Sequence, residues 1–152
     1  MPGKTGKRKI PEPTVPQDIH GLRRVADAQH ISALAHPISF SFKFLEERHA
    51  KFDYSKQPTK YFADLLARLK GCSTLSALEL IQKGDPSMRC HLIAWNKTTE
   101  KNFPKLPEPF SSCEPRQFSI SKKYGRVHGF FSGPIFYLVW LDPNHELYPW
   151  TG

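Results

Sequence analysis

The segment with the clearest structural pattern is RVHGFFSGPIFYLVWL, residues 126–141. Two apolar runs, 126–131 and 134–141, flank the dipeptide Ser132-Gly133, which is typical of the tight turn of a β-hairpin. The second run is apolar at odd and even positions alike, as expected for a central strand that is buried on both faces. With the alternating segment 117–121 before them, these runs predict three antiparallel strands.

Outward from this sheet, the first clear strand is predicted over residues 37–45. Four apolar side chains alternate there with Ser and Lys, and they are Ile38, Phe40, Phe42 and Phe44. A period of two puts them on one face of a strand. We therefore expect this face to carry much of the core and the opposite face to be polar and solvated.

Two helices are predicted between these strands. Residues 58–70 carry apolar side chains at i, i+3, i+4 and i+7, namely Phe62, Leu65, Leu66 and Leu69. A second helix follows at once, because Ser76 and Glu79 have the spacing of a capping box, and it ends at Gly84. So short a connection predicts a helical hairpin whose leucine stripe covers the phenylalanine face of the first strand.

The remaining segments are less regular. Residues 1–16 predict a disordered basic tail, and residues 17–28 have the spacing of a short helix. Residues 91–95 fit a strand or the end of a helix, and residues 97–115, with four prolines, predict a long loop. The predicted fold is α+β: an antiparallel sheet in β-α-α-β-β-β order, with a helical hairpin on one face and an N-terminal extension. Residues 17–152 form a single domain in this interpretation.

The net charge of +8 favours a polyanionic partner such as nucleic acid, the ribosome, an acidic protein or anionic lipid. The three cysteines, Cys72, Cys90 and Cys113, have no close pair, which argues against a disulfide framework and suits a reducing cytosol. No apolar run reaches the roughly 18 residues of a membrane helix, and the basic N-terminus lacks the apolar region of a secretory signal. We therefore expect a cytoplasmic protein without a membrane partner.

The strand 126–131 offers candidate catalytic side chains. Alternation puts Arg126 and His128 on one face, which is open to solvent or ligand if the other face meets the helices. His145 and Tyr148 follow the last strand. Metal-free cleavage of RNA needs a base for the 2′-hydroxyl proton, a cation for the phosphate and an acid for the leaving 5′-oxygen, and His and Arg suit these roles near neutral pH. We predict that Arg126, His128, His145 and Tyr148 are the catalytic residues.

Three further basic residues are predicted to hold flanking phosphates, and they are Lys122, Lys123 and Arg116. His91, next to Cys90, lacks partners at metal-ligand spacing, so we expect no metal and no other cofactor. Asp142, in the sequence DPNH, is more typical of a turn that caps backbone donors than of a catalytic acid.

The order of elements and the basic charge resemble the RelE/ParE superfamily of bacterial toxins, small basic proteins in which two helices pack on an antiparallel sheet. The resemblance covers roughly residues 37–148. In that family a basic residue on a middle strand and a His or Tyr after the last strand line the RNA-facing surface, and Arg126, His145 and Tyr148 occupy comparable places. The resemblance implies a metal-independent endoribonuclease toxin that cleaves messenger RNA, meets RNA or the ribosome, and is held in check by an acidic antitoxin. The N-terminal extension and the loop 97–115 depart from compact members of the superfamily.

A second hypothesis uses the same residues without catalysis. A basic sheet face can hold nucleic acid or an acidic partner in a non-catalytic binding or adaptor protein. His128 is then an ordinary half-buried sheet residue, Tyr148 an aromatic at the edge of the core, and Arg126 a solvated strand charge. Convergence of these side chains with His145 would favour the enzyme, whereas a wide separation would favour the binding protein.

Overall fold

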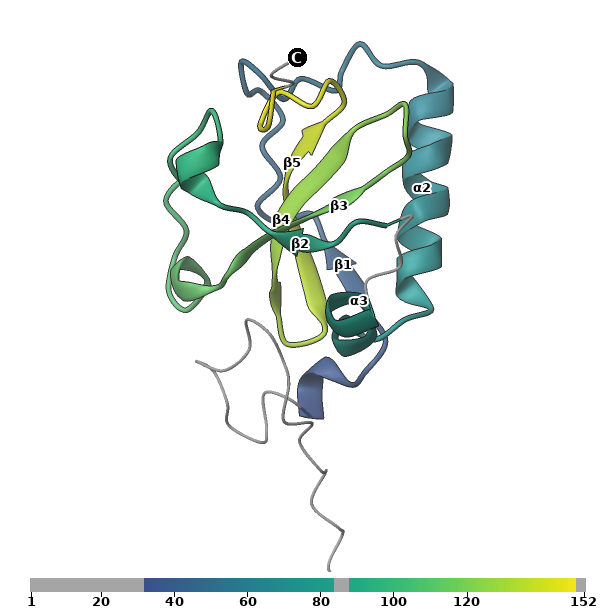
Figure 1. Cartoon of the computed structure of the whole chain (residues 1–152), viewed down its shortest axis with the longest axis vertical. Helices are drawn as coiled ribbons and strands as arrows, with labels where there is room; N and C mark the ends of the chain where they lie inside the picture. Colours follow the sequence, from purple (N-terminus) through teal and green to yellow (C-terminus); the bar gives the residue numbers. More distant parts are fainter. Residues whose placement is uncertain (1–31, 84–87, 150–152) are drawn as a thin grey trace, which may run out of the picture.

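A five-stranded sheet forms the centre of the computed structural model, which describes residues 32–83 and 88–149 (Figure 1). The strands lie side by side in the order β1-β5-β4-β3-β2. Their bounds are Ser39–Ser41 for β1, His91–Leu92 for β2, Pro115–Ser119 for β3, Arg126–Ser132 for β4 and Ile135–Asp142 for β5. The helices α2 (Thr59–Ser73) and α3 (Ala77–Lys83) lie between β1 and β2 along the chain, so the α+β class predicted from the sequence is confirmed.

The predicted hairpin of β4 and β5 is present, but its turn is Gly133-Pro134, one residue later than the predicted Ser132-Gly133. Ser132 pairs with Ile135, and Gly133 lies between them with a φ of +57°, in the left-handed region that glycine adopts without steric cost. β5 is a central strand, as its apolar pattern predicts, with β4 antiparallel on one side and β1 parallel on the other. Of residues 91–95, predicted as a strand or the end of a helix, His91–Leu92 form the short edge strand β2, and Trp95 begins a 3-10 turn.

The helix-side core lies between the sheet and α2, which runs along one side of the sheet in Figure 1. The side chains that α2 buries there are Tyr61, Leu65, Leu69 and Cys72. The predicted stripe was wrong in part, since the side chain of Leu66 is 64% exposed. The helix continues beyond Gly71 to Ser73, and its buried face is rotated toward Tyr61 and Cys72.

The capping box that begins α3 is confirmed. The Ser76 hydroxyl accepts a hydrogen bond of 3.0 Å from the backbone N–H of Glu79, and the Glu79 carboxylate accepts one of 3.2 Å from the backbone N–H of Ser76. These two bonds satisfy donors that a helix start leaves without an intrahelical acceptor.

The first strand is shorter than predicted. β1 ends at Ser41, and the backbone N–H of Leu45 bonds to the carbonyl of Phe42, so the chain turns where the alternation suggested a straight strand. Ile38 and Phe40 pack in the helix-side core, but Phe42 is 53% exposed. Phe44 lies against the opposite face of the sheet, so the prediction of three phenylalanines on one face was wrong.

A second, loop-side core covers the other face of the sheet. Its buried members are Phe52, Ile93, Phe130, Val139, Trp140 and Leu147. The segment 97–115, predicted as a long loop, supplies aromatic cover for this core through Phe103 and Phe110, with two short 3-10 turns at Trp95–Lys97 and Phe110–Ser112. The expectation that this face is open was therefore wrong. The face is closed by side chains from segments without regular secondary structure.

A register shift between β4 and β5 adds to this second core. His128 pairs with Trp140 and Gly129 pairs with Leu138, so β5 has one extra residue at Val139. Such a bulge turns two successive side chains toward one face. Both Val139 and Trp140 accordingly lie in the loop-side core.

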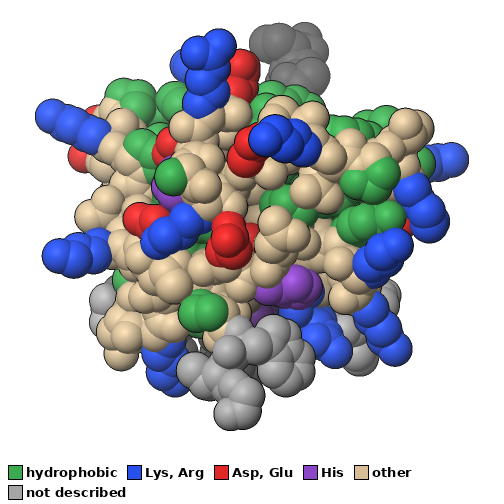
Figure 2. Space-filling model, turned by 90° about the horizontal axis from the view of Figure 1, so that it is seen from above, with side chains coloured by type: hydrophobic (Ala, Val, Ile, Leu, Met, Phe, Trp, Pro, Cys, Tyr) green, Lys and Arg blue, Asp and Glu red, His purple; other side chains and the backbone are tan. Residues whose placement is uncertain are grey.

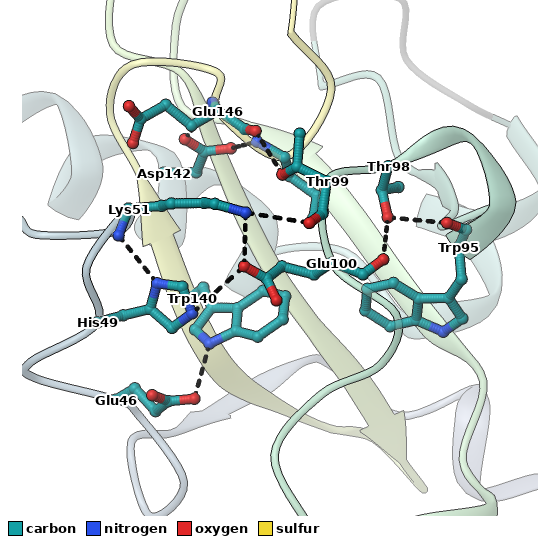
Figure 3. Close-up of polar contacts among 11 residues, drawn as sticks. Glu46, His49, Lys51, Trp95, Thr98, Thr99, Glu100, Trp140, Asp142 and Glu146 are labelled. Atoms are coloured by element: carbon teal, nitrogen blue, oxygen red, sulfur yellow. Dashed lines mark hydrogen bonds and ion pairs between the residues drawn. The ribbon is translucent and has the colours of Figure 1, made fainter.

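Polar contacts tie the covering segments together (Figure 3). The Lys51 ammonium donates to the Glu100 carboxylate at 2.8 Å and to the carbonyl of Thr99 at 3.0 Å. The Trp140 indole N–H donates to the carboxylate of Glu46 at 2.9 Å. These contacts join the segment after β1 to the loop after β2 and to the sheet.

Within the described ranges, no helix is both long and apolar enough to cross a bilayer. Cys72, Cys90 and Cys113 form no disulfide bond with one another. The predicted tail 1–16 and helix 17–28 lie outside the described residues.

Candidate functional site

Three of the four predicted catalytic residues line one pocket of about 290 Å³. Arg126 comes from the start of β4, and His145 and Tyr148 come from the segment that follows β5. The other lining residues are His91, Gln117 and Asp142. The convergence of Arg126 with His145 and Tyr148, which the enzyme hypothesis requires, is therefore present.

The turn after β5 is built around Asp142. Its carboxylate accepts backbone N–H bonds from Glu146 at 2.8 Å and from Leu147 at 3.0 Å, which confirms its predicted capping role. His145 lies inside this turn with a φ of +55°, a left-handed conformation that is costly for a residue with a side chain. The turn thus holds His145 at the pocket in a conformation that free chains rarely adopt.

Leu147 and Tyr148 bring the chain end back over the sheet. Leu147 is fully buried in the loop-side core. The Tyr148 hydroxyl accepts a hydrogen bond of 2.7 Å from the backbone N–H of Ala94. Because that bond uses a lone pair of the phenol, the Tyr148 O–H remains able to donate.

Arg126 is held at the edge of the pocket. One of its terminal nitrogens donates to the hydroxyl of Ser119 on the neighbouring strand. Burial lowers the pKa of Arg126, as does the nearby positive charge of Arg89, while Asp142 opposes the change. The guanidinium is therefore a poorly solvated cation, which is the kind of group that gains most from a bound anion.

Gly125 allows the turn before β4 to approach Asp142. Its φ is +77°, and a Cβ atom there would lie 1.9 Å from the carbonyl oxygen of Asp142. Only glycine permits this close approach. The β3–β4 turn and the turn that carries His145 are thus packed backbone to backbone.

The fourth predicted catalytic residue, His128, does not line the pocket. Its side chain is fully buried, and its Nε2 lies 2.9 Å from an oxygen of Asp142, which lines the pocket. Alternation had placed this face in the open, but Phe52 and Trp140 cover it, with ring centroids 6.0 and 6.4 Å from that of His128. This burial leaves no surface of His128 for a substrate to contact, and its Nε2 bonds to Asp142 instead.

The pKa values of this pair describe their charge state. Burial lowers the pKa of His128, and although Asp142 opposes this, the net direction is downward, so the imidazole is neutral near pH 7. Burial acts to raise the pKa of Asp142, but hydrogen bonds from His128, Leu147 and Glu146 outweigh it and lower the pKa overall. A neutral His128 therefore donates its Nε2–H to an ionised Asp142.

The pKa of His145 is also lowered, first by burial and then by the positive charge of Arg126. A histidine with a lowered pKa carries a free lone pair at neutral pH and can accept a proton. The pocket thus combines a potential base, His145, with a cation, Arg126, and a hydroxyl donor, Tyr148.

The three residues predicted to hold phosphates have different environments. Lys122 and Lys123 are exposed in the turn between β3 and β4, with the Lys123 ammonium 5.0 Å from the centre of the Tyr124 ring. Their phosphate contacts stay a prediction. Arg116 is only 5% exposed, and its guanidinium lies 3.6 Å from the Glu114 carboxylate. Arg116 is thus too deeply buried to meet a phosphate on the surface, and that prediction was wrong.

Sequence reasoning missed His91 and Gln117 as pocket residues. Alternation along 117–121 already puts Gln117 on the face opposite Phe118, but which strand it meets depends on a register that the sequence does not contain. His91 was weighed only as a metal ligand. Among the described residues, no three His, Cys, Asp or Glu side chains are grouped so as to hold a metal ion.

The face of the molecule drawn in Figure 2 carries charged side chains of both signs. Figure 2 shows Lys and Arg side chains spread around one face of the molecule, with Asp and Glu side chains among them. The pocket is distinguished by its combination of His, Arg and Tyr side chains rather than by a continuous basic patch.

Comparison with known proteins gives no assignment. No family model, no curated protein and no solved structure matches the chain.

Proposed function

We propose that this protein is a metal-independent endoribonuclease, a toxin of the RelE-like type that cleaves messenger RNA in the cytoplasm. The observation that carries the proposal is the shared pocket of Arg126, His145 and Tyr148. A base, a cation and a hydroxyl acid are the three groups that cleavage of RNA at the 2′-hydroxyl requires.

The proposed reaction assigns one role to each side chain. His145 takes the proton of the ribose 2′-hydroxyl, and the 2′-oxygen forms a bond to phosphorus. The bond from phosphorus to the 5′-oxygen breaks, and Tyr148 donates a proton to that oxygen. Arg126 stabilises the charge that develops on the phosphate. The products are a 2′,3′-cyclic phosphate and a 5′-hydroxyl end. His145 then releases its proton to solvent, and solvent returns the proton of Tyr148.

The proposed partners follow from the same assignment. RNA, free or on the ribosome, is the substrate, and an acidic antitoxin protein is the natural inhibitor of so basic a chain. Induced expression of the protein alone should then arrest growth.

The test is cleavage of a short RNA in the presence of a chelator, compared with the same sequence made as DNA. Tyr148→Phe and His145→Gln should each reduce the cleavage rate by about 10²–10⁴-fold. Arg126→Lys should also fail, because lysine keeps the charge but loses the planar fork that can bind two phosphate oxygens. The exposed His36 provides the matched control, so His36→Gln should cleave at the wild-type rate.

Two results would contradict the enzyme proposal. If each of the three pocket variants still cleaved RNA at the wild-type rate, the active site would have to lie outside this pocket. Binding of RNA without cleavage, weakened by Arg126→Lys, would instead support a non-catalytic nucleic-acid-binding protein.

A further inference from the structure

The loop after β2 forms a second pocket, which shares no lining residue with the pocket of Arg126. Its volume is about 550 Å³, within the range of roughly 300–1,000 Å³ that is usual for ligand sites. Its apolar lining comes from the loop and from the start of β3, and it includes Trp95, Phe103, Leu106, Phe110 and Pro115. The proposed cleavage reaction uses none of these side chains.

Trp95 and Phe103 present aromatic surface to this pocket. Both side chains are half-buried, so each ring is covered on part of its surface and open on the rest. The rings of Phe103 and Trp140 meet that of Trp95 at 86° and 82°, with centroids 5.1 and 6.1 Å away. Among the described residues, neither neighbour therefore lies parallel to the indole plane of Trp95. A flat ring from a ligand can take that stacked position.

The backbone of Trp95 is fixed by local hydrogen bonds. Trp95 begins a 3-10 turn, and the backbone N–H of Thr98 donates to its carbonyl at 3.2 Å. The Thr98 hydroxyl lies 3.0 Å from the same carbonyl oxygen and 2.6 Å from that of Glu100 (Figure 3). A binding residue whose backbone is already ordered loses less conformational entropy when a ligand binds.

The charge around this pocket suits a phosphate backbone. Lys105 lines the pocket, and the Lys43 ammonium lies 6.0 Å from the centre of the Phe110 ring. The acidic side chain in the lining is Glu108, whose carboxylate accepts a hydrogen bond from the Ser111 hydroxyl. Two ammonium groups thus stand against one carboxylate, which favours a polyanion at this pocket.

The two pockets lie along one strand and are joined through Tyr148. Pro115 lines the larger pocket and Gln117 the smaller one, and residues two apart on a strand point to the same face, roughly 6.6 Å from each other. The Tyr148 hydroxyl, which lies on the smaller pocket, bonds to the backbone N–H of Ala94, next to Trp95. A strand of RNA bound at the smaller pocket therefore has its neighbouring nucleotides close to the larger one.

We propose that the pocket of Trp95 and Phe103 binds an unpaired nucleobase of single-stranded RNA, next to the phosphodiester that lies at His145. This inference rests on the proposed function, because the nucleobase belongs to the strand that is cleaved. Every nucleobase has a flat π-face, so stacking on Trp95 selects unpaired RNA without selecting a sequence.

The experiment measures the Kd of the whole protein for a short oligomer of 2′-O-methyluridine, in which the attacking hydroxyl is blocked. The comparison ligand has the same length and charge but carries abasic sugars. The wild-type protein should bind the uridine oligomer about 5–150-fold more tightly, as expected for one stacked nucleobase. In Trp95→Ala this ratio should fall to about one. A general loss of affinity would weaken both ligands equally, so the ratio reports the nucleobase alone.

Phe62 on α2 gives the matched control, because it is also a half-buried aromatic residue but packs in the helix-side core. Phe62→Ala should keep the wild-type ratio. A ratio as large in Trp95→Ala as in the wild type would overturn the inference. If Trp95→Ala does not fold, fluorescence of Trp95→Phe decides, because a stacked nucleobase quenches indole emission. Quenching by the uridine oligomer that is equal in Trp95→Phe and the wild type would be equally contrary.

Two further outcomes separate this inference from its alternatives. Binding of a proline-rich peptide that is lost in Trp95→Ala, without binding of the oligomer, would overturn the inference and assign the pocket to a peptide. Cleavage of unmodified RNA is measured separately. A wild-type protein with the Trp95-dependent ratio but without cleavage would keep the nucleobase site and remove the proposed enzyme, whereas cleavage with a ratio of about one would remove the nucleobase site alone.

Discussion

The two faces of the sheet are covered in different ways. On the helix side, the cover is α2, an amphipathic helix whose buried side chains recur with helical spacing. On the loop side, the cover is irregular chain, including Phe52 after β1 and Phe103 in the loop after β2. Both covers bury aromatic side chains completely, yet only the first has a periodic sequence. The periodicity of apolar residues therefore predicts the secondary structure of a segment, but it says little about whether the segment is buried.

The difference also bears on the candidate site. The pocket opens on the loop side, where Gln117 and the segment that carries His145 meet. Its geometry depends on the Asp142 turn, in which the carboxylate accepts two backbone N–H bonds, and on Tyr148, whose hydroxyl accepts one from the backbone of Ala94. The helix-side core contributes to the stability of the fold. The loop side contributes to stability as well, and it also forms the candidate pocket.

The largest expected effect tests whether a residue buried in the loop-side core contributes as much to the free energy of unfolding as one in the helix-side core. Phe52 is fully buried, and its ring centroid lies 4.7 Å from that of Trp140. Phe52→Ala should lower the free energy of unfolding by about 3–5 kcal/mol, similar to the loss for Leu69→Ala on the helix side, about 2–5 kcal/mol. Urea unfolding at neutral pH measures both. A loss below about 1 kcal/mol for Phe52→Ala alone would mean that the irregular cover is loosely packed.

The next largest effect on the free energy of unfolding is expected at the buried carboxylate of Asp142. Asp142 accepts two backbone N–H bonds and one from His128. Asp142→Asn removes the charge and faces an amide N–H₂ toward a donor, so it should cost about 2–3 kcal/mol. Glu79→Gln, at the exposed capping box of α3, is the matched control because it also replaces a carboxylate by an amide at a backbone N–H. It should cost less than about 0.5 kcal/mol, since an exposed donor can turn to water. Equal losses would show that burial adds nothing to the Asp142 bonds.

The same contrast between the two faces explains which parts of the fold and of the candidate site could be predicted from the sequence. The β4–β5 hairpin, the capping box of Ser76 and the central place of β5 depend on local patterns, and each was predicted. The closure of the loop-side face was not, because contacts such as that of Phe52 with Trp140 join residues far apart in the chain. The convergence of Arg126 with His145 was proposed from strand order, whereas Gln117 needed the register of β3 with β4.

A smaller effect is expected from pH. The pKa of His128 in the folded protein is below the usual 6.5, so below that pH the unfolded chain binds a proton that the folded chain does not. The free energy of unfolding should therefore fall as pH drops from about 7.5 to about 5.5, by roughly 1.4 kcal/mol for each unit of the shift that this window covers. In His128→Gln this part of the decline should disappear. A slope unchanged by His128→Gln would assign the decline to His145, whose pKa is lowered in the same direction.

The smallest expected effect is at Phe42, where the two covers meet. Alternation over residues 37–45 predicts a core position, and a buried phenylalanine replaced by alanine would cost about 3–5 kcal/mol. In the structure its side chain is 53% exposed because β1 ends at Ser41, so Phe42→Ala should change the free energy of unfolding by less than about 0.5 kcal/mol. Phe40 is the matched control, since its ring centroid lies 6.2 Å from that of Phe136 in the helix-side core, and Phe40→Ala should cost about 2 kcal/mol. Urea unfolding of the two variants beside the wild type separates the alternatives. Comparable losses of unfolding free energy at both positions would favour the longer strand predicted over residues 37–45. A loss at Phe40 alone would support the end of β1 at Ser41, after which the chain passes from the helix-side core to the loop side.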